Sequence, residues 1–325
     1  AEKGTGYFYS KGKSSLSPFL KIYKAPSLGM FWSMPISWRF PFWLHRLAEN
    51  VDIIHFHFPF PLALLSNVFF SRSKILITWH SDIIRQKVLA ALLRPLIQRA
   101  LAHATAVITT SQSMIRTSNM LAGYRKKCRV IPLGIDPSPY KDPAQPQHPS
   151  EIASARAAGL PIILFVGRLV PYKGVDILIH ALTRMRTSCR ALIIGDGPLK
   201  DDLAALATNL GISDKIVFLG PLKDKALISY YQNSDIFVLP SVQASEAFGI
   251  VQLEAMACGI PVINTDLPTG VPEVSLDGQT GLTVKVGDPQ ALADALDRLV
   301  TDIPLRKRLG ENAKKRVHDL FTIEM

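Results

Sequence analysis

The chain has 325 residues, of which 48% are hydrophobic, and it carries a formal net charge of +11 at pH 7. That length exceeds one ordinary domain and suits two, and the composition is that of a soluble globular protein. The three cysteines, Cys128, Cys189 and Cys258, lie far apart in the sequence. They fit neither a disulfide framework nor a zinc-ligand spacing, which indicates a reducing cytoplasm.

The positive charge is confined to the first half of the chain. Residues 1–150 contain 19 Lys and Arg against 6 Asp and Glu, a net charge of +13, whereas the remainder contains 18 against 20, a net of −2. No recognisable nucleic-acid-binding motif accompanies this charge. An anionic membrane surface or a phosphate-bearing acceptor is therefore the favoured partner, and a charge excess that only aids solubility is the alternative.

The first stretch of the chain contains no clear targeting or membrane-spanning segment. Residues 1–17 show neither a signal-peptide pattern nor a strong strand. Residues 28–44 are rich in aromatic side chains, but Pro35 and Pro41 interrupt them and they are too few for a transmembrane helix. We expect these residues either to pack in the core or to form an interfacial patch that touches lipid.

Two short strands carry or precede histidines. Residues 51–61 are predicted to form a buried strand ended by prolines, and alternation along it places His55 and His57 on one face. A metal pair is conceivable there, but no third ligand is apparent nearby, so we predict no metal. A second strand, residues 74–78, is followed by His80, which lies where open α/β sheets bind ligands. A purely structural histidine is the alternative.

An amphipathic helix, a strand and a linker are predicted for the rest of the first half. Residues 83–103 have helical periodicity, with a kink expected at Pro95. The basic residues of this helix are Arg85, Lys87, Arg94 and Arg99. A strand is predicted over residues 106–111. Residues 137–149 contain five prolines among polar residues, which is typical of a linker.

The second half alternates strands and helices, a pattern that predicts a parallel, doubly wound sheet. Its strands are expected over residues 161–166, 191–194, 216–219, 235–239 and 280–286. The first of them is followed by a helix over residues 175–185. The turn between the two carries Arg168 and Lys173, where two cations can converge on an anion at a helix N-terminus. A surface ion pair is the alternative.

Residues 245–261 are predicted to form a loop and a short helix. Backbone N–H groups at the helix entrance, those of Gly249 and Ile250, are free to bind an anion. Glu246 lies before this entrance and Glu254 lies inside the helix. Carboxylates beside a diphosphate are favourable only if they accept hydrogen bonds from hydroxyl groups, which describes a sugar nucleotide. A capping acid and a solvated helix acid are the alternative.

The segment E-A-F-G-I-V-Q-L-E-A-M-A-C-G-I-P-V-I resembles the E-x7-E segment of the large retaining glycosyltransferase family typified by bacterial mannosyl- and glucosyltransferases of polysaccharide synthesis. The G-R-L-x-x-x-K-G turn agrees with it, as does R-V-I-P-L-G-I-D, in which Leu133 replaces the usual Asn. The resemblance covers residues 51–321. The strand, Gly-rich loop and helix with which that family begins are not visible, nor is its closing helix, so we expect the sequence to be a fragment.

This resemblance implies the α/β architecture called GT-B, two Rossmann-like, doubly wound domains that face each other across a cleft. Residues 1–140 would form the acceptor-side domain, 141–160 a linker, and 161–325 the domain that binds the nucleotide sugar. The implied catalytic residues are His80, near the donor sugar and the reacting centre, and Glu246, which would orient the transferred sugar. The implied donor-binding residues are Gly167, Arg168, Lys173, Phe248, Gly249, Ile250 and Glu254, the last at the ribose.

The resemblance implies a transferase that retains anomeric configuration and needs neither a metal nor a cofactor. It would move a hexose, with GDP-mannose favoured, to a lipid-linked or growing polysaccharide acceptor. We expect a peripheral protein at the cytoplasmic face of an anionic membrane, with no nucleic-acid partner. The alternatives are a UDP-sugar-dependent glucosyl- or N-acetylglucosaminyltransferase, a GT-B sugar-nucleotide epimerase and a non-catalytic, membrane-associated binding subunit.

Overall fold

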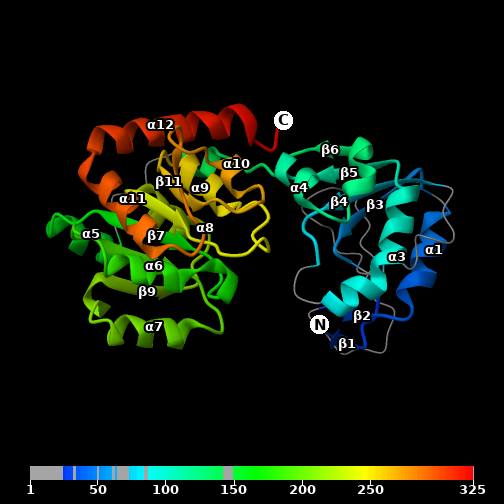
Figure 1. Ribbon diagram of the computed structural model, residues 1–325, viewed down its shortest axis with the longest axis horizontal. Helices are drawn as coiled ribbons and strands as arrows, with labels where there is room; N and C mark the ends of the chain where they lie inside the picture. The colour runs from blue at the N-terminus through cyan, green and yellow to red at the C-terminus, as the bar shows by residue number, and fades with distance from the viewer. Residues whose placement is uncertain are drawn as a thin grey trace. The chain divides into compact units, whose positions relative to one another are not determined.

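The computed structural model describes residues 25–31, 34–49, 51–60, 63, 73–83, 87–141 and 149–324. They form two compact units. The first takes in the described residues up to Thr109 together with Ser118–Val130, and the second consists of Thr110–Thr117 and the residues from Ile131 onward. Each unit contains a parallel sheet, and both are drawn in Figure 1.

The first unit is built on a four-stranded parallel sheet. Its strand order is β3 (Ile53–Phe58), β4 (Lys74–Trp79), β5 (Ala106–Thr109) and β6 (Cys128–Val130). β3 and β4 pair from Ile53 beside Lys74 to Phe58 beside Trp79, so both strands end at the same edge. Ile54, Phe56 and Phe58 are buried and alternate with exposed residues. This alternation confirms the prediction that the two histidines of β3 share a face.

A lysine side chain caps one helix of this unit. The helix α3 (Lys87–His103) contains Pro95 and confirms the predicted helix from Lys87 onward, while residues 84–86 lie outside the described residues. The Nζ atom of Lys127 donates hydrogen bonds to the carbonyls of Leu101, Ala102 and Ala104. These carbonyls lie at or just beyond the end of α3, where they lack helical partners and where a positive charge is favourable.

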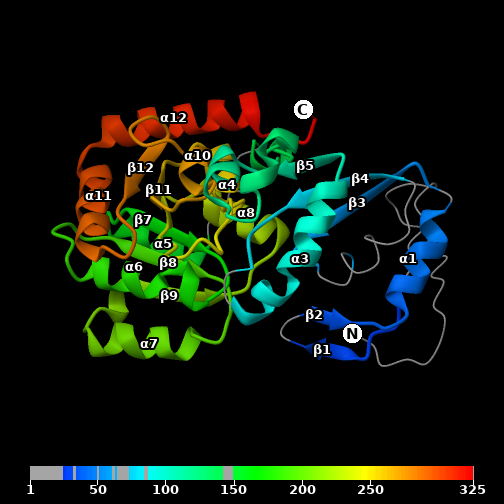
Figure 2. The ribbon, with the colours of Figure 1, turned by 45° about the vertical axis from the view of Figure 1, so that its right-hand side comes forward.

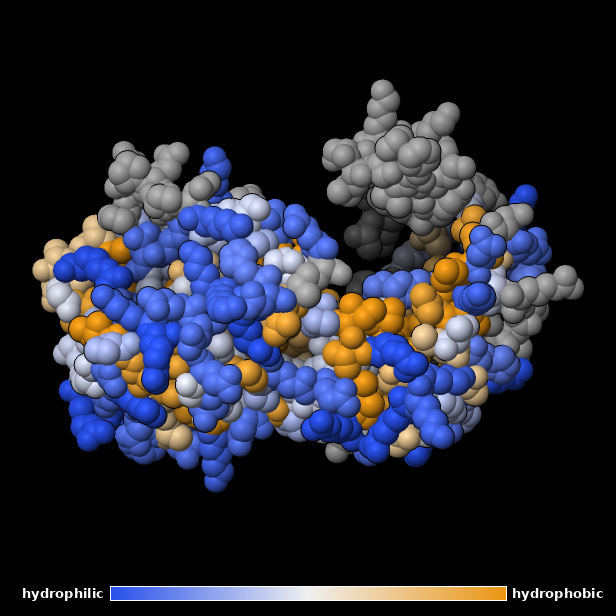
Figure 3. All heavy atoms as spheres, turned by 90° about the horizontal axis from the view of Figure 1, so that it is seen from above, coloured by the Kyte–Doolittle hydropathy of each residue, from blue (hydrophilic) through white to orange (hydrophobic). Residues whose placement is uncertain are grey.

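The aromatic stretch of residues 28–44 forms an antiparallel pair, β1 (Gly29–Phe31) and β2 (Met34–Ile36), followed by α1 (Phe40–Ala48). Trp38 is 59% exposed and Phe42 is 71% exposed, so these two rings do not pack in the core. On the face drawn in Figure 3, hydrophobic side chains lie in small groups among hydrophilic ones. Among the described residues, no helix combines the length and the apolar character needed to cross a bilayer.

The second unit is built on a six-stranded parallel sheet. Its strand order is β12 (Gly281–Val284), β11 (Val262–Thr265), β10 (Ile236–Leu239), β7 (Ile162–Val166), β8 (Arg190–Ile194) and β9 (Ile216–Gly220). The residues of β7 and β10 are all buried and apolar, as expected for parallel strands covered on both faces.

Helices form two separate cores with this sheet, and Figures 1 and 2 show α12 near the β12 end of the strand order and α7 near the β9 end. One core includes α6 (Val175–Leu182), α7 (Lys200–Asn209) and α11 (Pro289–Thr301). The other includes α5 (Ser150–Ala157), α8 (Asp224–Gln232), α9 (Val251–Ala257), α10 (Val271–Val274) and the later part of α12 (Ile303–Leu320). The unit is therefore doubly wound, as the alternating pattern predicted.

The boundary between the units differs from the expected one. Residues from Ile131 belong to the second unit, and Ile135 forms a β-bridge with Thr322 there. The predicted linker, residues 141–160, contains α5, whose Ile152 and Ala155 are buried in the second core. The short helix α4 (Gln112–Thr117) also belongs to this unit, and its first N–H groups donate to the Glu273 carboxylate.

Candidate functional site

Two loops of the second unit meet because β7 and β10 are neighbours in the sheet. The loop after β7 turns at Gly174, whose φ of +66° is in the left-handed region. A Cβ atom there would lie 2.1 Å from the Pro240 carbonyl oxygen, so only glycine fits. The Val242 N–H donates to the Tyr172 carbonyl at 2.8 Å. These contacts hold Lys173, the residue before Gly174, against the loop that follows β10.

The two loops bring Lys173 and Glu246 together. Lys173 Nζ lies 2.5 Å from Glu246 Oε2, and each side chain is 10% exposed. The Ser241 hydroxyl donates to the same Oε2 at 3.0 Å, and Ser241 is completely buried. Within the described residues Oε1 has no hydrogen-bond donor. The sequence predicted separate roles for these side chains and gave no sign that they pair.

Arg168 differs from Lys173, although both belong to the same turn. Its side chain is exposed, and no ion pair or hydrogen bond to it is found within the described part of the chain. Gly167, just before it, donates its backbone N–H to Ile194 and is packed near the side chain of Lys173. The turn therefore presents one buried, paired cation and one exposed cation.

The entrance of α9 is shaped by Gly249, whose φ is +72°. A Cβ atom there would lie 2.6 Å from Leu239 Cδ2 and 2.9 Å from Gln252 Nε2. Phe248 is buried, and its ring packs edge-on against Phe321, with centroids 6.1 Å apart. The structure therefore places this predicted donor-binding side chain in the core. Among the described residues, the N–H groups of Gly249 and Ile250 have no acceptor.

Glu254 lies against two tyrosines that the sequence did not single out. The Tyr231 hydroxyl donates to Glu254 Oε2 at 2.7 Å, and Tyr140 lies close enough to act on the pKa of this carboxyl group. Burial raises the pKa of Glu254, and the hydroxyl groups of Tyr231 and Tyr140 oppose that rise. Tyr140 falls within the proline-rich residues predicted as a linker, and Tyr231 lies on α8, so neither had a functional signal. The helical periodicity of α8 could only have indicated a core position for Tyr231.

His80 belongs to the first unit. Its backbone N–H donates to the Phe58 carbonyl at 3.1 Å, which continues the pairing of β3 and β4. Its ring nitrogen Nε2 lies 2.9 Å from Nδ1 of His57. Burial, followed by the charges of His57 and His55, lowers the pKa of His80. His55 Nε2 lies 2.7 Å from the Thr78 hydroxyl, and burial lowers its pKa as well.

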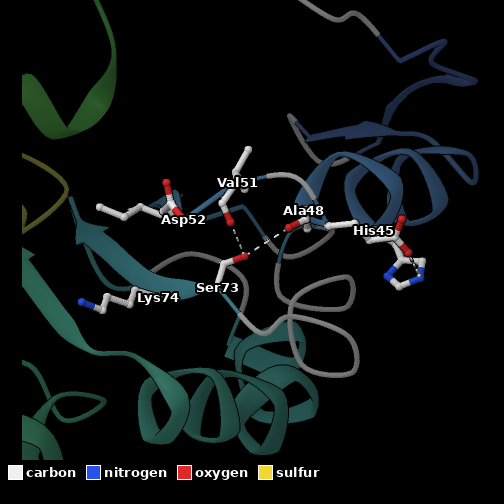
Figure 4. A pocket seen from close by; sticks show the side chains of 8 residues that line it. His45, Ala48, Val51, Asp52, Ser73 and Lys74 are labelled. Carbon is white, nitrogen blue, oxygen red and sulfur yellow. Dashed lines mark hydrogen bonds and ion pairs between the residues drawn. The ribbon is translucent and has the colours of Figure 1, made fainter.

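The described residues contain no group of three or more His, Cys, Asp and Glu side chains able to hold a metal ion. A pocket of about 860 Å³ lies at the amino-terminal ends of β3 and β4, whereas His80 follows the carboxyl end of β4 (Figure 4). There the Ser73 hydroxyl bonds the carbonyls of Ala48 and Val51. None of the predicted site residues lines it, and ligands of open α/β sheets bind at the carboxyl ends of the strands. We therefore assign it no role.

Comparison with known proteins supplies the family. Residues 150–316 match the family model for glycosyl transferases group 1, and residues 9–139 match that for Glycosyltransferase Family 4. The chain is 37% identical over 280 residues to the D-rhamnosyltransferase WbpZ of Pseudomonas aeruginosa, a match that covers 85% of this chain and 71% of that protein. It is 33% identical over 286 residues to O-antigen chain mannosyltransferase C of Escherichia coli, with 86% and 74% covered.

Among solved structures, Anabaena HepE in complex with UDP matches with a TM-score of 0.76 and 25% identity over 87% of this chain and 78% of that one. The two Rossmann-like units and this match confirm the expected GT-B fold. The protein therefore belongs to the glycosyl transferases group 1 family and is a glycosyltransferase that takes its sugar from a nucleotide sugar.

Proposed function

We propose that the protein is a retaining hexosyltransferase of polysaccharide biosynthesis. Its donor would be GDP-mannose, and its acceptor a lipid-linked or growing polysaccharide. The observation that carries this proposal is the buried Lys173–Glu246 pair at the carboxyl ends of β7 and β10, beside the exposed Arg168. The names of the two relatives, a rhamnosyltransferase and a mannosyltransferase, support a hexose-type donor. The UDP bound to HepE keeps a UDP-sugar as the alternative.

The cationic groups suit a leaving diphosphate. The Arg168 guanidinium is free to bind phosphate oxygens with two parallel hydrogen bonds. The Lys173 ammonium has three donors, so its contact with Glu246 leaves others for phosphate or sugar oxygens. With the N–H groups of Gly249 and Ile250, these donors would stabilise the charge that develops on the leaving phosphate. On this mechanism, no divalent metal or cofactor is needed.

The two carboxylates suit hydroxyl groups. Glu246 Oε2 is held by Lys173 and Ser241, which leaves Oε1 to accept a hydrogen bond from the transferred hexose. Glu254 is held by the Tyr231 hydroxyl and retains acceptor capacity for a ribose hydroxyl. Glu246 would thus orient the sugar, and Glu254 would bind the nucleoside.

The proposed reaction exchanges one bond at the anomeric carbon. The bond from this carbon to the leaving phosphate oxygen breaks, and a bond to the acceptor oxygen forms on the same face of the sugar ring. The acceptor's proton passes to the leaving phosphate, which keeps its electron pair. His80 would meet the sugar near this reacting centre.

Donor hydrolysis across a panel of nucleotide sugars tests the donor, and proton NMR of the product tests retention. We expect GDP-mannose to react fastest, the product to keep the donor's anomeric configuration, and activity to survive excess EDTA. Faster turnover of a UDP-sugar would favour the alternative donor. Inversion, or a loss in EDTA that magnesium or manganese restores, would contradict the mechanism.

We also propose that the first half of the chain docks on an anionic membrane. The net charge of +13 over residues 1–150 supports this, as do the exposed rings of Trp38 and Phe42. The Arg39 guanidinium lies 4.8 Å from the Trp38 ring centre, which puts a cation beside an exposed aromatic group. Docking of this kind would suit an acceptor carried by a lipid.

A further inference from the structure

We propose that His57 is a positioning residue for His80: it occupies Nε2 of His80 and leaves Nδ1 as the ring nitrogen that meets the donor sugar. This inference rests on the proposed function, in which His80 lies near the transferred hexose. The observation behind it is the contact of 2.9 Å between His57 Nδ1 and His80 Nε2.

The geometry is that of a hydrogen bond close to the ring planes. The two imidazoles are nearly parallel, at 13°, and their centroids are 5.2 Å apart. With the two nitrogens only 2.9 Å apart, both lie between the ring centres, so the rings meet edge to edge. The backbone supports this arrangement, because His57 pairs in register with Thr78 and the His80 N–H donates to the Phe58 carbonyl.

His55, two residues before His57 on the same face of β3, steadies the ring of His57. The ring of His55 lies 4.8 Å from that of His57, at 27°, and His55 Nε2 is itself 2.7 Å from the Thr78 hydroxyl. His55 and His57 stand on β3 and Thr78 on the neighbouring strand β4, and His80 directly follows β4. A side chain held in this way loses little further freedom when a substrate binds.

Proton counting then limits what His80 can do. A hydrogen bond between two ring nitrogens contains a single proton, so either His80 Nε2–H donates to His57 or His57 Nδ1–H donates to His80. Nε2 of His80 is occupied in both cases. If both rings become cationic, both nitrogens carry protons and the bond is lost. The bond therefore survives while at least one of the two rings is neutral, and burial and the histidine neighbours of His80 lower its pKa.

Nitrogen-15 NMR of histidine-labelled protein at pH 7.5 tests the pairing without any reaction. We expect the His80 Nε2 signal to show a hydrogen bond to the neighbouring ring in the wild type and to lose it in His57→Leu. His57→Asn places an amide nearly where Nδ1 lies, and this amide can donate or accept, so it should restore the hydrogen-bonded Nε2 signal. His103→Phe, which removes a histidine of α3 outside this cluster, is the control, and it should leave the His80 signals unchanged. An unchanged His80 spectrum in His57→Leu would overturn the proposal.

Kinetics provides the second test. His57→Leu should lower kcat for hexose transfer by up to about 100-fold, because misplacing a group beside the reacting atoms costs about that much. The Kd of the bare nucleoside diphosphate should stay unchanged. Combined with His80→Ala, it should reduce kcat no further than His80→Ala alone, because both changes remove one function. If the double variant instead lost kcat by the product of the two single losses, the two residues would act independently and the positioning role would be contradicted. If instead His80→Ala kept full activity, the role of His80 in the proposed function would fail, whatever the NMR result.

Discussion

Lys173 Nζ lies 2.5 Å from Glu246 Oε2 between the loops that follow β7 and β10, and both side chains are almost fully buried. A buried ion pair of this kind adds little net stability when it is complete. The loss of one partner is severe, because it leaves an uncompensated charge away from water. The pair therefore links the stability of the second unit to the chemistry of the proposed donor site.

Glu246→Ala and Lys173→Ala should each destabilise the second unit by roughly 3–5 kcal/mol, because each leaves one buried charge unpaired. The double variant Lys173→Met, Glu246→Gln should recover most of that stability but not the activity. Thermal unfolding and transfer assays on the same preparations would check this. A double variant as unstable as the single ones would show that the pair acts through other contacts.

Arg168→Ala should separate donor binding from stability. Its side chain is exposed, so we expect an unchanged Tm, weaker donor binding and slower turnover, since one cation at the leaving diphosphate is lost. Calorimetric titration of the donor, with Lys200→Ala as a control at the start of α7, is the measurement. Normal affinity and turnover would exclude Arg168 from the diphosphate site.

Glu254→Gln should weaken nucleotide binding without lowering stability at neutral pH. Burial raises the pKa of Glu254, so its stabilising contribution is complete below the unfolded pKa, near 4.5, and is lost as pH rises through the folded pKa. Removing the charge avoids that loss at pH 7. Calorimetry with GDP and UDP should show a larger rise in Kd for Glu254→Gln than for Glu246→Gln. The reverse order would mean that the two carboxylates exchange roles.

The first unit should lose stability in mild acid. Burial is the first cause that lowers the pKa of both His55 and His80, so their contribution is present above the unfolded value of 6.5 and is lost as pH falls through the folded pKa. Thermal melts followed by tryptophan fluorescence should show a Tm that drops below pH 6.5. His55→Phe should flatten that drop. A profile that stays flat down to pH 5 would contradict the lowered pKa values.

Liposome flotation checks the proposed membrane docking. The protein should float with vesicles that contain anionic lipid and not with neutral ones, and salt should release it, since each basic residue near the surface contributes about 1 kcal/mol. Trp38→Ala with Phe42→Ala should weaken flotation even at low salt. If the protein floated with neither vesicle type at low salt, the positive charge would serve a soluble acceptor or only solubility.

Local patterns predicted much of this structure. Continuous apolar runs gave β7 and β10, helical spacing gave α9, and strand alternation placed His55 and His57 on one face. Each of these depends only on residues that are near one another in the sequence.

Long-range contacts could not be predicted in this way. The pairing of Lys173 with Glu246 depends on β7 and β10 being adjacent, which no local pattern specifies. Tyr140 reaches Glu254 from proline-rich residues whose composition indicates only a linker. The prediction that residues 141–160 form a linker was wrong for the same reason, because α5 packs into the second core through contacts with residues distant in sequence.

Phe321, which directly follows α12, contacts the residue before Gly249 at the proposed donor site. Phe321 packs edge-on against Phe248, and the Arg316 guanidinium lies 5.5 Å from the Phe321 ring centre. A smaller side chain at position 321 would leave Phe248 room to shift, and with it the backbone of Gly249. We therefore expect the residue types at positions 248 and 321 to covary in volume among relatives, because both side chains are buried against each other.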